Sequence, residues 1–305
     1  MRACVVAILG LTVALAACGS ERPAREGASG PFRADVRIAS TPEAEIAWYE
    51  RGEGPPLLML MGTGSTMSEW DPALLRLLAR DRRLIMLDYP GLGLSEPQPW
   101  KGRSFDQLAD DVEALMAAIG LERASVLGWS MGGFVAQRLA IRHPERVEAV
   151  VLAGTNPGGS VTALGTEEAQ RIDSLPDPSE AEILSELYPP GHRGEGRAFM
   201  RRLERASQSG EIPDDFDVPS ATVEAQVAAE DPWLRSDENY RQLGALGVPA
   251  LAAGGLRDPV VPPLNLELIA ARVPDGELAL LPGAHAFLFQ ERIAFARELD
   301  RFLPG

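Results

Sequence analysis

The most constraining feature of the sequence is the segment 128–133, GWSMGG, which joins two stretches of different periodicity. Residues 124–127 before it are apolar enough for a buried strand, and residues 134–141 after it have the spacing of a helix. A strand that passes into a helix within so few residues requires a tight, strained turn. Glycines at Gly128 and Gly132 remove the side chains that would collide in such a turn. The segment therefore predicts a buried strand, a sharp bend and a helix in immediate succession.

Segments typical of strands and of helices alternate along most of the chain. Apolar runs or apolar–polar alternation predict eight strands, at residues 32–38, 44–49, 56–61, 83–87, 124–127, 147–152, 248–253 and 277–281. Apolar residues at helical spacing predict helices at residues 74–79, 105–119, 134–141, 264–273 and 292–302. This alternation indicates the α/β class. We expect a mostly parallel eight-stranded sheet with helices on both faces and an antiparallel hairpin at one edge.

Residues 160–243 interrupt the alternation. They contain no strand pattern, and prolines and glycines divide them into helical pieces. Acidic residues outnumber arginines here, so this segment carries most of the formal net charge of −15. We predict that 160–243 is a helical cap, inserted after the sixth strand of an α/β core formed by 32–159 and 244–305. The negative charge and the lack of a basic run argue against a nucleic-acid partner.

Ser130, in the middle of the strand-to-helix turn, is the candidate nucleophile. A serine hydroxyl needs a base to take its proton, and the chain has three histidines. His143 follows a predicted helix and His192 lies in a proline-rich part of the predicted cap, so both are expected at the surface. His285 lies in the loop after the last predicted strand, at the carboxyl edge where open α/β sheets bind ligands. We therefore predict that His285 is the base.

Asp258 is the candidate for the acid that orients this histidine. It follows the predicted strand 248–253, so its carboxylate is expected at the same edge of the sheet. There it would fix the imidazole tautomer and stabilise the imidazolium formed during catalysis. The helix after Ser130 begins at the same place, with free N–H groups and the positive end of its dipole. The backbone N–H of Met131 is therefore a predicted oxyanion donor.

Together with the turn at 128–133, the order Ser130, Asp258, His285 resembles that of the α/β-hydrolase superfamily. The resemblance extends over residues 32–302 and implies the α/β-hydrolase sheet with a cap after its sixth strand. It also implies a second oxyanion donor, the backbone N–H of Thr63, in the loop after the third strand. That loop reads MGTGS, with methionine where the family has histidine, and a backbone donor does not depend on that side chain.

The serine narrows the chemistry that the resemblance implies. Haloalkane dehalogenases and epoxide hydrolases of this fold have aspartate at the position of Ser130, so neither activity is expected. We predict hydrolysis of a small-molecule carboxylic ester, or a related acyl bond, through an acyl-enzyme and without metal or organic cofactor. Proline iminopeptidases and cofactor-free perhydrolases are similar and use the same triad, so both stay alternatives. The alternative from another class is a non-catalytic surface lipoprotein that binds a small ligand.

The first residues have the pattern of an export signal. Arg2 precedes an apolar run, Val5–Ala17, which is too short to span a bilayer comfortably and ends at Cys18. This ending resembles a bacterial lipobox and implies a signal peptide over 1–17, a lipid anchor at Cys18 and a flexible tether over 18–31. We expect an exported lipoprotein of the cell envelope, anchored in a membrane on the periplasmic or surface side. A plain signal peptide cleaved near residue 17 is the alternative.

Overall fold

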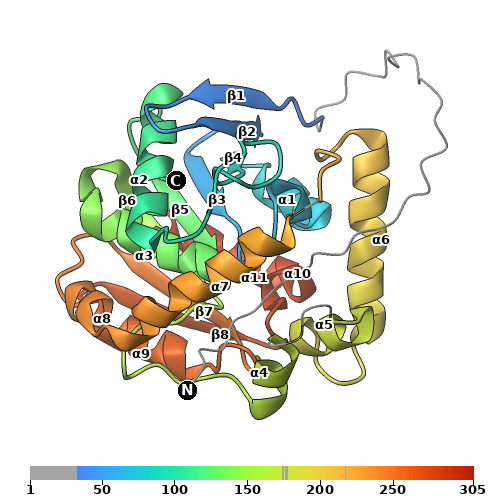
Figure 1. Cartoon of the computed structure of the whole chain (residues 1–305), viewed down its shortest axis with the longest axis vertical. Coiled ribbons are helices and arrows are strands. Elements are labelled where there is room, and N and C mark those ends of the chain that lie inside the picture. Colours follow the sequence, from blue (N-terminus) through green and yellow to red (C-terminus); the bar gives the residue numbers. More distant parts are fainter. Residues whose placement is uncertain (1–32, 174, 176–177, 217) are drawn as a thin grey trace.

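A computed structural model describes residues 33–173, 175, 178–216 and 218–305. The predicted signal peptide, the tether and Cys18 lie outside these residues. An eight-stranded sheet forms the centre of the protein (Figure 1), with strands β1 (Arg37–Ser40), β2 (Glu45–Arg51), β3 (Pro56–Leu60), β4 (Arg83–Leu87), β5 (Ala124–Trp129), β6 (Val147–Ala153), β7 (Ala250–Gly255) and β8 (Gly276–Leu281).

The strand order across the sheet is β1-β2-β4-β3-β5-β6-β7-β8. Strand β2 pairs antiparallel with both β1 and β4, and every other neighbouring pair is parallel. This confirms the predicted α/β class, the mostly parallel eight-stranded sheet and the antiparallel edge hairpin. The central strand β5 is buried along its whole length. Because both of its faces are covered, its sequence is apolar without alternation.

Helices cover both faces of the sheet because the chain changes direction across it. The connection from β3 through α1 (Pro72–Leu78) to β4 runs one way, and that from β5 through α3 (Met131–Arg142) to β6 runs the other. Right-handed crossovers in opposite directions place their helices on opposite faces. The helix α2 (Phe105–Ala118) packs on α3, and α9 (Leu264–Arg272) packs on β7 and β8. The last helix, α11 (Arg292–Phe302), packs on α1.

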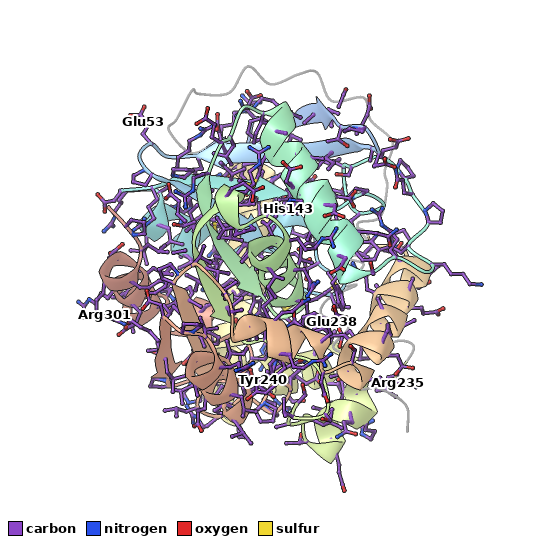
Figure 2. All side chains as sticks on the ribbon, turned by 90° about the vertical axis from the view of Figure 1, so that its left-hand side faces the viewer. Glu53, His143, Arg235, Glu238, Tyr240 and Arg301 are labelled. Atoms are coloured by element: carbon purple, nitrogen blue, oxygen red, sulfur yellow. The ribbon has the colours of Figure 1, made fainter. Side chains whose placement is uncertain are left out.

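Among the described residues between β6 and β7, where the cap was predicted, there are five helices: α4 (Glu167–Asp173), α5 (Glu180–Leu187), α6 (Arg193–Ser209), α7 (Ser220–Arg235) and α8 (Glu238–Leu243). Figure 1 shows α6 upright at one side of the molecule, and α7 running obliquely across the front of the sheet toward α8. The turn between α7 and α8 is exposed, with Arg235 and Glu238 at its two ends (Figure 2). No helix in the described part of the chain is both long enough and apolar enough to cross a bilayer.

Candidate active site

Ser130 occupies the turn between β5 and α3, as its sequence context predicts. Its backbone has φ 55° and ψ −122°, and within the described residues it is the only non-glycine residue with a positive φ. The turn is held on both sides, because Ser130 N–H donates to the carbonyl of Ala153 at 2.9 Å and Gly133 N–H donates to the carbonyl of Ser130 at 2.8 Å. A strained residue held this way is typical of a functional site.

The glycines around Ser130 are required by close backbone approaches. A Cβ atom on Gly128 would lie 2.2 Å from the carbonyl oxygen of Gly132, and one on Gly132 would lie 2.2 Å from the carbonyl oxygen of Leu60. A Cβ atom on Gly133 would lie 2.5 Å from the side chain of Thr155. The close approach at Gly132 brings the end of β3, and the loop that follows it, next to the nucleophile.

Asp258 and His285 form a buried pair. Oδ2 of Asp258 lies 2.8 Å from Nδ1 of His285, and both side chains are fully shielded from solvent. The other carboxylate oxygen, Oδ1, accepts the N–H groups of Val260 and Val261, each at 2.9 Å. An acceptor on Nδ1 makes that nitrogen the donor, which leaves Nε2 with a free lone pair to act as a base. The structure therefore brings the predicted acid and base into direct contact at Nδ1 of His285.

Two consecutive residues at the end of β6 lie close to Ser130 and to His285. Ala153 accepts the N–H of Ser130, and a Cβ atom on the next residue, Gly154, would lie 3.4 Å from Cε1 of His285. The indole of Trp129 donates to the carbonyl of His285 at 3.1 Å. Nε2 of His285 is buried and has no hydrogen-bond partner among the described residues. Ser130 and His285 are therefore not hydrogen-bonded to each other in this structure, and catalytic hydrogen bonds commonly tighten only when substrate is bound.

The loop predicted to supply the second oxyanion donor lies against the nucleophile. A Cβ atom on Gly62 would lie 3.0 Å from Cβ and 3.6 Å from Oγ of Ser130. Two side chains of α7 hold the next residues: Gly64 N–H donates to Oε1 of Gln226 at 2.8 Å, and the Thr63 hydroxyl donates to Oε1 of Glu230 at 3.5 Å. The roles of the Thr63 and Met131 N–H groups stay predictions; Met131 directly follows Ser130, and Thr63 directly follows Gly62.

A small cavity of about 30 Å³ opens beside Ser130. Its lining combines the serine with core and cap residues, among them Leu164, Asp173, Glu230, Val261 and Asn265. In this measure a water molecule occupies about 10–15 Å³, so a substrate of more than a few atoms requires movement of the lining.

Sequence reasoning did not single out Asp173, Glu186 or Glu230. Burial raises the pKa of Glu230 to about 8. Burial, followed by the charge of Asp258, raises the pKa of Glu186 to about 8. Burial, followed by the charges of Glu186 and Glu230, raises the pKa of Asp173 to about 9. The sequence of α7 does place two of the buried polar residues, Gln226 and Glu230, on one helical face. Helical spacing alone, however, does not distinguish a buried polar face from a solvated one.

The other two histidines lie away from this cavity. Nε2 of His143, at the end of α3, lies 2.8 Å from Oδ1 of Asp110 (Figure 2). Nδ1 of His192 lies 2.8 Å from Oε1 of Glu195. Neither residue contributes to the lining beside Ser130. In the described part of the chain, no cluster of three or more His, Cys, Asp or Glu side chains has the arrangement of a metal site.

Comparison with known proteins identifies the family to which the chain belongs. A family model described as the alpha/beta hydrolase fold matches residues 55–292. The chain belongs to this family and is a hydrolytic enzyme. The match spans the turn at Ser130, the cap helices and the loops of Asp258 and His285, so all of the candidate site lies inside it.

Among individual proteins, the chain is similar to a putative carbamate hydrolase of Azorhizobium caulinodans, with 27% identity covering 85% of this chain and 97% of that protein. It is also similar to a poly(3-hydroxyalkanoate) depolymerase of Ectopseudomonas oleovorans, with 27% identity over 81% of this chain and 84% of the relative. An alpha/beta hydrolase fold protein from Chitinophaga pinensis has the same fold, with a TM-score of 0.78 at 22% identity, covering 90% of this chain and 98% of that structure.

Proposed function

We propose that this protein is a serine hydrolase that cleaves a small-molecule carboxylic ester through an acyl-enzyme. The observation that carries the proposal is the buried Asp258–His285 pair at the same sheet edge as Ser130, which is held with a positive φ on the strand-to-helix turn. A free surface serine would be a weak nucleophile, whereas a serine next to an oriented imidazole can lose its proton during attack.

The proposed reaction has two halves, formation of the acyl-enzyme and its hydrolysis, and the same residues act in both. Oγ of Ser130 attacks the acyl carbon while Nε2 of His285 takes the hydroxyl proton, and Asp258 stabilises the imidazolium through Nδ1. The backbone N–H groups of Thr63 and Met131 donate to the oxyanion of the tetrahedral intermediate. His285 then protonates the leaving alcohol. In the second half His285 deprotonates a water molecule that attacks the acyl-enzyme, and it then returns this proton to Oγ of Ser130 as the acid product leaves.

The relatives support an ester or a closely related acyl bond as the target. The depolymerase acts by name on a polymer, and another relative, from Legionella pneumophila, is named a pimeloyl-[acyl-carrier protein] methyl ester esterase (24% identity, 83% of this chain). Carbamates share with esters a carbonyl carbon that a serine can attack. Peptidase and perhydrolase chemistry would use the same triad, and reporters with amide bonds or with peroxide as acceptor separate them from ester hydrolysis.

The experiment that tests the proposal is covalent labelling with a fluorophosphonate, together with hydrolysis of short p-nitrophenyl esters. We expect the wild type to be labelled and Ser130→Ala to be unlabelled, with kcat lowered by roughly a million-fold. Ser209→Ala, an exposed serine at the end of α6, is the matched control and should label normally. Absence of labelling and of ester cleavage in a folded wild type would favour a small-ligand-binding protein instead.

The proposed location rests on the sequence of the first residues alone. We infer that Cys18 is lipidated and that the tether 18–31 connects the enzyme to a membrane of the bacterial envelope. Metabolic labelling with an alkyne fatty acid tests this, because Cys18→Ala should lose both the label and the membrane fraction. An unlabelled, freely released wild-type chain would show a plain signal peptide.

A further inference from the structure

Helix α6 carries a row of exposed arginines on a chain whose net charge is −15. Arg193, Arg197, Arg201 and Arg205 occupy every fourth position of this helix. Four residues of an α-helix turn by about 40° and rise by about 6 Å, so the four side chains form an arginine stripe about 18 Å long. The helix has five arginines and two acidic residues. It therefore differs from the predicted cap as a whole, in which acidic residues outnumber arginines.

The opposite side of α6 is fixed to the rest of the protein. Its buried residues share the side of the helix away from the arginine stripe: Gly196, Phe199, Leu203 and Ala206. Between the two sides, the guanidinium of Arg202 donates to both carboxylate oxygens of Asp71, at 3.1 and 2.6 Å. Asp71 is the N-cap of α1, so this pair holds α6 against a core helix. Figure 1 shows α6 along the outer edge of the molecule, where the stripe faces outward.

The arginine stripe is only partly neutralised within the protein. Among the described residues, three of its four arginines form no ion pair, and the fourth, Arg197, has Glu180 at 3.8 Å between Nη1 and Oε1. One acidic residue of α6, Glu204, shares the face. Like charges four residues apart destabilise a helix. An anion that lies across neighbouring side chains relieves this repulsion, and a guanidinium group can bind a phosphate through two parallel hydrogen bonds.

The N-terminal part of the chain joins the fold beside the same helix. The N–H of Ala34 donates to the carbonyl of Gly210, the residue that follows α6, at 3.0 Å. The proposed lipid anchor, Cys18, lies 15 positions before Arg33. A chain of that length spans at most about 50 Å. A lipidated Cys18 therefore keeps this end of α6 within about 50 Å of the membrane surface, close enough for the helix to contact it.

We propose that the arginine stripe of α6 binds the phosphate groups of anionic lipids, so that the enzyme lies against a membrane through this helix. The inference goes beyond the proposed hydrolase activity, and its choice of a membrane as the partner rests on the proposed anchor at Cys18. An anionic bilayer attracts basic segments within about a Debye length of its surface. It repels the rest of a chain whose net charge is −15. The stripe therefore sets the orientation of the enzyme on the membrane.

The test measures binding of the full chain to vesicles of phosphatidylcholine, either alone or mixed with an equal amount of phosphatidylglycerol. We expect the wild type to prefer the anionic vesicles, and to lose this preference between about 0.15 M and about 1 M salt as the Debye length falls from about 8 to about 3 Å. The triple variant Arg193→Gln, Arg201→Gln, Arg205→Gln should bind the anionic vesicles about 10- to 100-fold more weakly, because each arginine near such a surface contributes roughly fivefold. Its binding to phosphatidylcholine alone should not change.

The matched control is the triple variant Arg123→Gln, Arg235→Gln, Arg241→Gln. These arginines are also exposed and lie outside α6, so the control has the same net charge as the α6 variant. It should keep most of the wild-type preference for anionic vesicles. A melting temperature close to that of the wild type checks that each variant folds. If the triple α6 variant does not fold, Arg201→Glu alone decides the case, with binding to the anionic vesicles expected to fall at least roughly tenfold.

Three results would overturn the proposal. The wild type could show no preference for anionic vesicles, or the α6 variant and its control could lose the preference equally. Binding to an acidic polypeptide without binding to the anionic vesicles would make the partner a protein. The same measurements on Cys18→Ala separate this proposal from that of the lipid anchor, because the α6 substitutions should weaken binding to anionic vesicles by the same factor without lipid at Cys18. Vesicle binding needs no turnover, so failure of the proposed hydrolase activity would leave this test intact.

Discussion

The role proposed for Asp258 depends on both of its carboxylate oxygens. Oδ1 of Asp258 receives two backbone N–H groups and Oδ2 receives the Nδ1 proton of His285. Both oxygens are acceptors, so the carboxylate dictates the imidazole tautomer. Replacing one oxygen with an amide nitrogen would place a donor where an acceptor is needed.

Asp258→Asn should therefore fold normally and lose activity. If the amide oxygen keeps the two N–H groups, the amide nitrogen faces Nδ1 and forces the proton to Nε2, where it blocks the base. We expect kcat for a p-nitrophenyl ester to fall by about 10⁴-fold with a nearly unchanged melting temperature. Asp231→Asn, which removes an exposed partner of Arg235, is the control. A loss below about tenfold would contradict the assigned role of Asp258.

At the scale of elements, helices of the predicted cap contact two loops of the candidate site. The last residues of α5 accept backbone N–H groups from the histidine loop, His285 to the carbonyl of Glu186 at 3.3 Å and Ala286 to the carbonyl of Leu187 at 3.0 Å. Helix α7 holds the oxyanion loop through Gln226 and Glu230. These contacts tie the positions of His285 and of the Thr63 loop to helices α5 and α7.

Gln226→Ala should test the contact made by α7. It leaves the buried N–H of Gly64 without its acceptor, which costs about 1–3 kcal/mol and loosens the loop that carries Thr63. We expect kcat to fall by about 10- to 100-fold, with little change in fluorophosphonate binding before reaction. Glu224→Ala, two residues away on the exposed side of α7, should keep wild-type kcat. Equal kcat in both variants would show that α7 does not position the loop.

For the whole molecule, the buried acids make stability depend on pH. The pKa values of Asp173, Glu186 and Glu230 lie at about 9, 8 and 8, above those of exposed carboxyl groups. At pH values between the ordinary carboxyl pKa and these raised values, the folded chain holds protons that the unfolded chain has lost. The free energy of unfolding therefore falls as pH rises through this range. Arg171, which faces Glu186, opposes this shift, whereas the charges of Asp258, Glu168 and Glu182 add to it.

Thermal melting at about pH 6 and about pH 9 measures this effect. The wild type should melt at a lower temperature at the higher pH, and Glu230→Gln should reduce the difference because it removes one of the proton-holding groups. For a chain of this size, each kcal/mol recovered corresponds to about 2–4 °C. Buried Asp88, with a pKa of about 7, keeps part of the dependence in the variant. An identical fall in both proteins would show that Glu230 ionises freely.

The sequence by itself determined the α/β class, the strand-to-helix turn at Ser130 and the identity of the paired acid and base. These features are local: apolar runs, glycines and loops directly after strands all leave a pattern in neighbouring residues. Only the tertiary structure decided that Asp173 and Glu230 meet beside the nucleophile and that Gln226 holds the oxyanion loop. Those contacts join residues of the cap to one another or to the core, and an acidic side chain on a helix has the same sequence pattern whether it faces water or a buried cavity.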